Sequence, residues 1–220
     1  MSHDQSDSSI GNDNVSLPLE NKSGSVTARK APMYELFVLG ELMDGPHYGY
    51  LLRDILGRLL GPFRHISWGV LYPLIRRLER EGLIVPDEKS GAVQSESTQG
   101  NKQRKQYRIT EAGQRRFLSL MLETGDYTAD YPELFLIKLN NLDHLTNEQK
   151  LVVLWHYREY LQVEKKYLQE GQRNISGGTL SIPEDQRAHV LDIISFRLSG
   201  IQAEIDWVAR KIARLESEKE

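Results

Sequence analysis

The stretch "SWGVLYPLIRRLEREGLI", residues 67–84, combines an amphipathic helix with a proline near its start and a glycine that leads into strand-forming residues. Pro73 cannot donate a backbone hydrogen bond to the carbonyl of Gly69, a loss that costs least near the amino end of a helix. At 100° per residue, one sector of this helix is apolar. It holds Trp68, Leu71, Leu74, Ile75 and Leu78, and the opposite side holds Gly69, Tyr72, Pro73, Arg76, Arg77 and Arg80. The stretch therefore predicts a helix with one face in a core and a basic, aromatic-edged face turned outwards.

The segments around this helix predict a small domain. Apolar residues recur at helical spacing from Met33 to about Met43, and again over residues 47–61. Residues 83–85 and 104–109 have strand character, a polar loop separates them, and Thr110 is a cap for a further helix. The order helix, helix, helix, strand, loop, strand, helix is that of a winged helix-turn-helix over residues 31–123. We expect a mainly α chain with a small β-hairpin, in which the third helix faces DNA and the hairpin is the wing.

The outward face of the third helix has the chemistry of a DNA contact. Backbone amides and a hydroxyl near its start suit phosphates, and its arginines suit phosphates or base edges. The alternative is a solvated face, with some arginines paired to Glu79 and Glu81. The residues expected at DNA, including three at the base of the wing, are Ser67, Gly69, Tyr72, Arg76, Arg77, Arg80, Lys102, Arg104 and Lys105.

Composition limits the environment of the chain. Residues 30–116 carry 14 Lys and Arg against 10 Asp and Glu, whereas residues 117–220 carry 12 against 17, so the first half suits an anionic partner better. The absence of cysteine fits a reducing compartment, and no apolar run approaches the length of a membrane span. We therefore expect a cytoplasmic protein without membrane contact. Residues 1–30, rich in Ser, Asn, Asp and Gly, predict a disordered tail.

Residues 130–220 predict a second, helical domain for dimerisation and effector binding. Thr146 and Gln149 form a capping box for a long helix over about residues 147–172. The last helix carries an apolar seam at 3,4 spacing over four heptads, at Leu191, Ile194, Leu198, Ile201, Ile205, Val208, Ile212 and Leu215. The seam needs a partner: the preceding helix of the same chain, the same helix of a second subunit, or both. We expect a homodimer whose two recognition helices read a pseudo-palindromic operator.

Four aromatic or titratable residues lie near this expected interface. They are candidates for an effector pocket, and the alternative is packing within the core or the interface. They are Trp155, His156, Tyr157 and Trp207.

Three segments resemble the PadR family of bacterial transcriptional regulators. They are "MYELFVLGELMDGPHYGYLLRDI", "GVLYPLIRRLEREGLI" and "RKQYRITEAG", in that order over roughly residues 32–118. His47-Tyr48-Gly49-Tyr50 has one tyrosine more than the His-Gly-Tyr of the family. The resemblance implies a winged helix, a homodimer, and repression that a small aromatic effector such as a phenolic acid relieves.

The sequence lacks the common motifs of nucleotide-binding sites, metal sites and metalloproteases. The chain has no phosphate-cradling GxxxxGK[ST], no dinucleotide-binding GxGxxG and no HExxH, and its histidines lack the spacing of a metal site. We therefore expect no cofactor, no metal and no enzymatic activity. Besides the DNA-binding regulator, two hypotheses remain: a winged-helix module that binds another protein rather than specific DNA, and, with least support, an enzyme with a pocket around residues 155–157.

Overall fold

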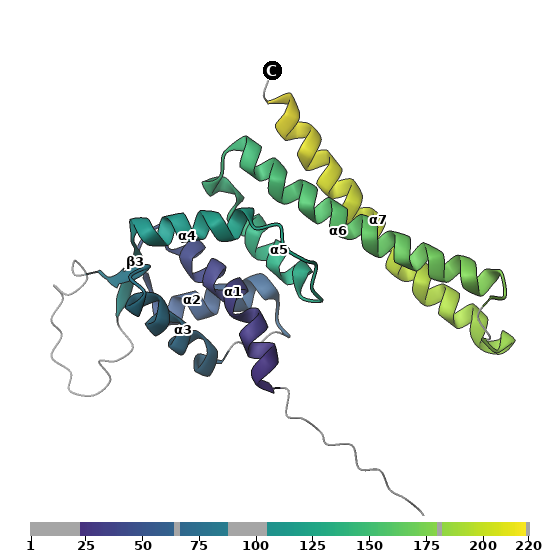
Figure 1. The fold of residues 1–220 in the computed structure, drawn as a ribbon, viewed down its shortest axis with the longest axis horizontal. Helices are drawn as coiled ribbons and strands as arrows, with labels where there is room; N and C mark the ends of the chain where they lie inside the picture. The colour runs from purple at the N-terminus through teal and green to yellow at the C-terminus, as the bar shows by residue number, and fades with distance from the viewer. Residues whose placement is uncertain (1–22, 64–66, 88–104, 180–181, 219–220) are drawn as a thin grey trace, which may run out of the picture.

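The computed structural model describes residues 23–63, 67–87, 105–179 and 182–218. The chain is mostly helical, with one three-stranded antiparallel sheet among these residues (Figure 1). No helix in the described ranges is long and apolar enough to cross a membrane. The elements are α1 Ser23–Glu41, β1 His47–Tyr48, α2 Gly49–Leu60, α3 Trp68–Arg80, β2 Ile84–Pro86, β3 Gln106–Ile109, α4 Glu111–Leu122, α5 Tyr131–Asn140, the 3-10 turn η2 Leu142–His144, α6 Asn147–Ser176 and α7 Glu184–Ser217.

Helix α1 is the centre of the first domain. It contacts α3, α4 and α5, and side chains from Leu36 to Leu39 are fully buried. It begins at Ser23, ten residues before the expected Met33, so the predicted tail over residues 1–30 is wrong for residues 23–30. Adding turns to a helix that tertiary packing has already nucleated is easier than starting one, and composition does not reveal this. Residues 1–22, the rest of that predicted tail, lie outside the described residues.

The sheet contains one strand that the sequence did not predict. Its order is β1-β3-β2, with His47 opposite Tyr107 in one pair and Ile84 opposite Ile109 in the other. The predicted hairpin strands are present as β2 and β3. Residues 47 and 48 were expected to be helical, but they pair with β3 instead, and α2 starts only at Gly49. A two-residue strand has no periodicity of its own, so only its partner reveals it.

Helix α3 follows the prediction closely. It runs without interruption through Pro73, and Leu71, Leu74, Ile75 and Leu78 are buried. The helix ends at Arg80, and the expected terminating glycine, Gly82, follows its C-cap with a φ of 69° that favours glycine. The amide of Leu83 donates to the carbonyl of Leu78 at 2.9 Å. Ser67 holds the N-cap position but makes no capping hydrogen bond with its side chain.

Helix α4 packs tightly on the turn between α3 and β2. The hydroxyl of Thr110 caps α4 by accepting from the amide of Gly113 at 3.1 Å, and it donates to the carbonyl of Gly82 at 2.7 Å. Gly113 is buried, and a Cβ at this position would lie 2.1 Å from the carbonyl oxygen of Leu83. The first turn of α4 therefore approaches the backbone more closely than any other residue type permits.

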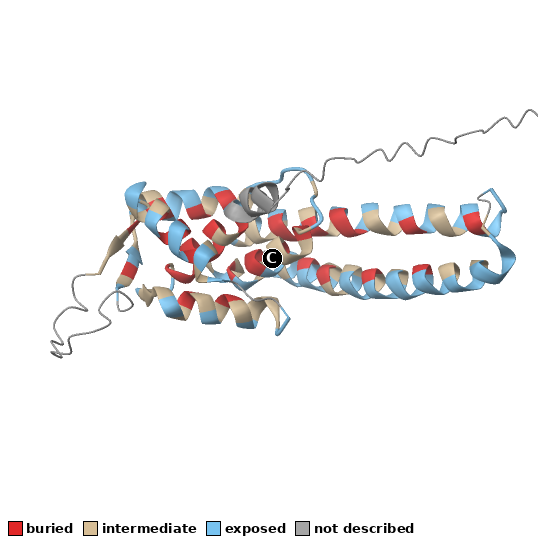
Figure 2. Cartoon of the chain, turned by 90° about the horizontal axis from the view of Figure 1, so that it is seen from below, coloured by how far each residue is buried: buried red, intermediate tan, exposed pale blue. Residues whose placement is uncertain are grey.

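Helix α5 joins the first domain to a long hairpin of α6 and α7 (Figure 1). The side chain of Asn140 donates to Glu41 of α1 at 3.0 Å, and Asn141 lies against Gly40. The capping box of Thr146 and Gln149 is confirmed at the start of α6. Helices α6 and α7 pack along their length, with buried residues recurring on both (Figure 2).

The close approach at Gly113 predicts an effect on stability. Gly113→Ala should lower the free energy of unfolding by about 1–3 kcal/mol, because the added methyl group collides with backbone that cannot move aside. Gly200→Ala is the control, since a Cβ there meets nothing within 4 Å and alanine favours a helix interior by up to about 1 kcal/mol. Denaturant unfolding of both variants measures the difference, and equal stability would contradict the packing described here.

Candidate nucleic-acid interface

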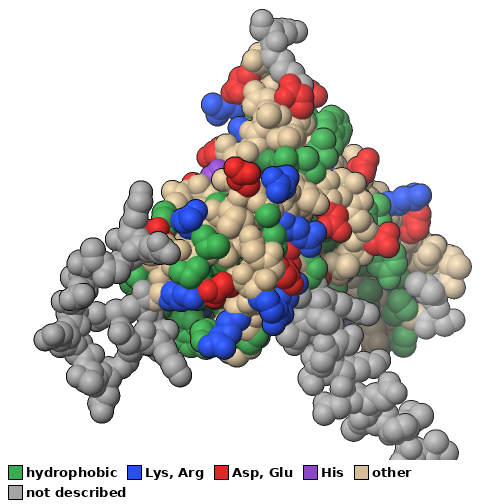
Figure 3. Space-filling view, turned by 60° about the vertical axis from the view of Figure 1, so that its left-hand side comes forward, with side chains coloured by type: hydrophobic (Ala, Val, Ile, Leu, Met, Phe, Trp, Pro, Cys, Tyr) green, Lys and Arg blue, Asp and Glu red, His purple; other side chains and the backbone are tan. Residues whose placement is uncertain are grey.

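The outward face of α3 is open to solvent. Tyr72, Pro73, Arg76 and Arg80 are exposed, as are Ser67 and Gly69 at the start of the helix. In Figure 3, which brings this end of the molecule forward, Lys and Arg side chains lie among hydrophobic ones in the lower half of the view. The face therefore combines positive charge with aromatic surface, as the sequence indicated.

A buried carboxylate fixes α3 in the domain. Glu35 of α1, whose side chain is 4% exposed, accepts from Arg77 of α3 at 2.5 Å and from Arg116 of α4 at 2.6 Å. The side chain of Arg77 is half-buried in this contact, and that of Arg116 is more exposed. The sequence prediction placed Arg77 at DNA, whereas the structure gives its guanidinium a partner inside the protein. The sequence analysis missed Glu35, because its partners lie 42 and 81 residues away along the chain.

Arg76 and Tyr72 form a pair one turn apart on the outward face. The guanidinium of Arg76 donates to the hydroxyl of Tyr72 at 2.5 Å and lies 4.6 Å from the centre of its ring. This contact orients the arginine along the helix surface rather than into bulk solvent. Arg80 lies one further turn along the same exposed face.

Of the three wing residues predicted to contact DNA, Lys105 lies in the described part of the chain. The ammonium of Lys105 donates to Glu79 of α3 at 2.6 Å, and this hydrogen bond raises the pKa of Lys105. Lys105 thus links the base of the wing to α3. Lys102 and Arg104 lie outside the described residues, so their predicted role at DNA stays a prediction.

The seam of α7 packs against α6 of the same chain, one of the three alternatives that the sequence left open. Ile194, Ile201, Val208 and Ile212 are buried, whereas Leu191, Leu198, Ile205 and Leu215 are half-buried. Other apolar side chains are more exposed: Val163 and Tyr167 on α6, and Ile193 and Phe196 on α7. Phe196 is 81% exposed. The assignment of the whole seam to a contact between subunits stays a prediction, and the outer faces of the hairpin offer further apolar surface.

The structure brings together two of the four predicted effector residues. Tyr157 and Trp207 line a cavity of about 350 Å³ between α5, α6 and α7, together with Phe135, Leu136 and Val208. The ring of Tyr157 stacks on Phe135 at 3.5 Å, and its hydroxyl donates to Glu204, another lining residue. Burial and this carboxylate raise the pKa of Tyr157, so the phenol stays protonated. We name this space the hairpin cavity.

The other two predicted effector residues point elsewhere. Trp155 is exposed, and Arg158 lies 4.7 Å from the centre of its ring. His156 is hydrogen-bonded to Tyr131 of α5 and packs against Tyr127. Burial lowers the pKa of His156, and so does the nearby Lys138, whose own pKa burial lowers to about 8. The consecutive positions 155–157 therefore face three different surroundings, as helical geometry requires of neighbours.

Comparison with known proteins finds a family match within the first domain. Residues 38–119 match the family described as "Transcriptional regulator PadR-like family". Among curated protein sequences, none matches the chain.

Solved structures of several regulators align with most of the chain. Bacillus subtilis PadR in complex with operator DNA is 16% identical, with a TM-score of 0.35, and the alignment covers 82% of this chain and 98% of that one. The same protein in complex with p-coumaric acid is 17% identical, with a TM-score of 0.35 and coverage of 84% and 99%. The Vibrio cholerae virulence activator AphA is 20% identical, with a TM-score of 0.31 and coverage of 86% and 99%. The likeness to the family therefore rests on the match over residues 38–119.

The contact with Glu35 predicts different roles for two neighbouring arginines. Arg77→Ala should lower the free energy of unfolding by about 1.5–3 kcal/mol, because the variant cannot make the charged hydrogen bond to a buried carboxylate. Arg80→Ala, on the exposed face, should change it by less than about 0.5 kcal/mol. Chemical denaturation of both variants tests this, and an Arg77→Ala protein as stable as the parent would exclude a structural role for the contact.

Proposed function

We propose that this chain, whose residues 38–119 form a PadR-like domain, is a sequence-specific DNA-binding transcriptional regulator without catalytic activity. The observation that carries the proposal is the outward face of α3, where Arg76 and Arg80 are exposed while Glu35 fixes the helix from behind. A helix presented in this way fits the major groove, which is wide enough to admit it. Arg76, Arg80 and Tyr72 are the contacts we assign to bases and phosphates, with Ser67 and Gly69 at a phosphate. Because a bacterial regulator of this kind acts on genomic DNA, we expect the protein in the cytoplasm.

We assign Arg77 to the support of α3 rather than to DNA. Its guanidinium is already paired with Glu35. Pulling it away would leave a buried carboxylate with one partner fewer, which is unfavourable. We keep Lys105 as a phosphate contact at the base of the wing, because its side chain stays partly exposed although it is bonded to Glu79.

The regulator is a homodimer in this proposal. Two copies related by twofold symmetry place their α3 helices in successive major grooves, about 34 Å apart, and so read a pseudo-palindrome. The surface that supports dimerisation is the outer side of the hairpin, because a monomer would leave Phe196, Ile193 and Tyr167 in water. The half-buried residues of the α7 seam, which pack towards α6, also leave part of their apolar surface exposed.

A small aromatic effector is proposed to bind in the hairpin cavity and to relieve repression. The cavity has the volume and the aromatic lining of a small-molecule site. Glu204 is its carboxylate, so a phenolic acid would direct its hydroxyl towards Glu204 and its own carboxylate towards solvent. Because α5 forms one wall and also contacts α1 and α2, a ligand here acts on the junction between the hairpin and the winged helix. A ligand that binds most tightly to a dimer whose α3 helices are not spaced for two successive major grooves shifts the population to that dimer and so releases the DNA.

The DNA contact is tested with the double variant Arg76→Ala and Arg80→Ala. Its Kd for the preferred duplex should rise at least about 30-fold at low salt, since the variant loses two contacts to base edges, each worth about 1–3 kcal/mol. The slope of log Kd against log salt should fall by about one for each phosphate that the variant no longer neutralises. Fluorescence anisotropy at several salt concentrations measures both quantities.

The matched control is Arg173→Ala with Arg214→Ala, which removes the same charge from the exposed surface of the hairpin. This control should bind DNA nearly as well as the parent. If both double variants bind alike, α3 is not the recognition helix. That result would favour the alternative hypothesis, a winged-helix module that binds another protein.

The dimer is tested by placing a charge on the hairpin. Phe196→Glu should shift the protein from dimer to monomer in sedimentation velocity, because a buried carboxylate without a partner is costly in an apolar interface. Phe63→Glu is the control, since Phe63 is 93% exposed on the first domain. A parent protein that is monomeric at micromolar concentration would contradict the dimer outright.

The effector site is tested by filling the hairpin cavity. Leu136→Trp should abolish the heat of binding of a phenolic acid such as p-coumaric acid in calorimetry, and should leave DNA binding insensitive to it. Trp155→Phe should retain both responses, because Trp155 does not line the cavity. The opposite pattern would place the effector beside Trp155 and overturn the assignment.

A further inference from the structure

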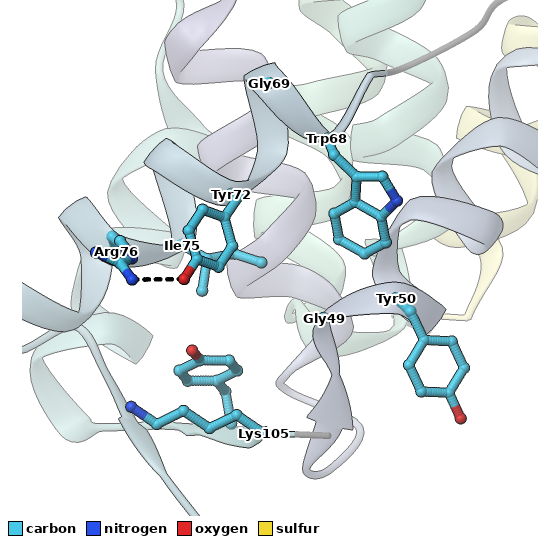
Figure 4. A pocket seen from close by; sticks show the side chains of 9 residues that line it. Gly49, Tyr50, Trp68, Gly69, Tyr72, Ile75, Arg76 and Lys105 are labelled. Carbon is cyan, nitrogen blue, oxygen red and sulfur yellow. Dashed lines mark hydrogen bonds between the residues drawn. The ribbon is translucent and has the colours of Figure 1, made fainter. Parts of the chain in front are cut away.

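A second hollow lies on the outward face of α3 itself. Its volume is about 600 Å³, and three segments form it: α3, the start of α2 after β1, and the β3 strand with the residue before it. Figure 4 shows Trp68 and Tyr72 projecting from α3 towards Gly49 and Lys105. The apolar part of the lining consists of Tyr50, Trp68, Tyr72, Ile75 and Tyr107. We name this space the α3 hollow.

The two cations of the α3 hollow already have partners. Arg76 donates to Tyr72, and Lys105 donates to Glu79, which lies outside the lining. Both charged groups are therefore held against the sides of the hollow by these hydrogen bonds. Gly49 and Gly69 add backbone without side chains, which keeps the space open. What the hollow offers an incoming group is mainly aromatic and aliphatic surface.

The position of the hollow on α3 indicates which chemical group would enter it. Tyr72 and Arg76 belong both to the hollow and to the proposed DNA contact, so a duplex bound at α3 brings its major groove to this opening. Most groups that base edges present in that groove are hydrogen-bond donors and acceptors, and the apolar one is the 5-methyl group of thymine. Burying a methyl group against aromatic rings is favourable, whereas burying the amino group of cytosine there without a partner is not.

We propose that the α3 hollow reads thymine through its 5-methyl group. The proposal rests on the proposed function, because it requires α3 to lie in the major groove. The volume of the hollow is far larger than that of one methyl group. Successive bases of one strand rise by about 3.4 Å, so the methyl groups of two adjacent thymines enter the same space. The preferred half-site therefore contains a thymine pair next to the bases that Arg76 and Arg80 contact.

Replacing thymine by deoxyuridine tests the proposal directly, because it removes the methyl group and leaves all hydrogen-bonding groups in place. A preferred duplex is first selected from a random pool with the full-length protein. Each thymine is then replaced singly, and Kd is measured by anisotropy. We expect one or two adjacent positions in each half-site at which Kd rises about fivefold, a loss comparable to one buried methyl group. The other positions should change Kd less than twofold.

Two variants of one residue connect the effect to the hollow. Tyr72→Ala removes a wall and should reduce the thymine-to-uracil ratio of Kd values at the sensitive positions to below twofold. Tyr72→Phe keeps the ring and loses the hydroxyl that pairs with Arg76, so it should retain the fivefold ratio. Circular dichroism confirms that both variants are folded, as expected for an exposed residue.

The outcomes separate this proposal from the proposed function. Specific binding that no uracil weakens by more than twofold overturns the thymine reading and leaves the regulator intact. Sensitivity that persists in Tyr72→Ala places the methyl contact elsewhere and also overturns it. Phenolic compounds that still bind the Leu136→Trp variant, whose hairpin cavity is filled, and that compete with a uracil-insensitive duplex would make the α3 hollow a ligand site instead. Failure to select any duplex would overturn the proposed function, and the thymine reading with it.

Discussion

The buried carboxylate of Glu35 is the contact on which the arrangement of the first domain depends. It joins three helices, because Arg77 of α3 and Arg116 of α4 both donate to an acid that belongs to α1. Hydrophobic packing brings these helices together but does not fix the rotation of α3 about its own axis. A charged hydrogen bond has a defined direction and adds that restraint. The outward direction of Arg76 and Arg80 follows from it.

The second restraint acts at the end of α3. Gly82 turns the chain, and Gly113 lets α4 approach the backbone of that turn. Strand β2 starts from the same point and pairs with β3, so the wing is anchored beside α3. At its other end the domain continues through α5 into the hairpin. Helix α5, one wall of the hairpin cavity, contacts α1 and α2, and both of these contact α3, so packed helices connect the cavity to α3.

Local signals in the sequence predicted most of the elements. The capping box at Thr146, the cap at Thr110, the terminating glycine at Gly82 and the apolar stripe of α3 all act within a few residues, and each is present. Features that depend on distant partners were missed. Strand β1 exists because β3 pairs with it, and Arg77 turns inwards because Glu35 lies 42 residues earlier in the chain. Helical periodicity alone assigns Arg77 to the same side as Arg76.

The sequence by itself determined the order of elements of a winged helix, with a basic, aromatic third helix and a long helical continuation. These properties follow from patterns of neighbouring residues, each contained within one helix or one turn. Only the tertiary structure decided which arginine supports the fold and which faces outwards, which of four candidate effector residues share a cavity, and that α6 covers the seam of α7. It also revealed the α3 hollow, whose walls come from three separate segments. Contacts between remote residues depend on how helices rotate and cross, and spacing along one chain does not contain that information.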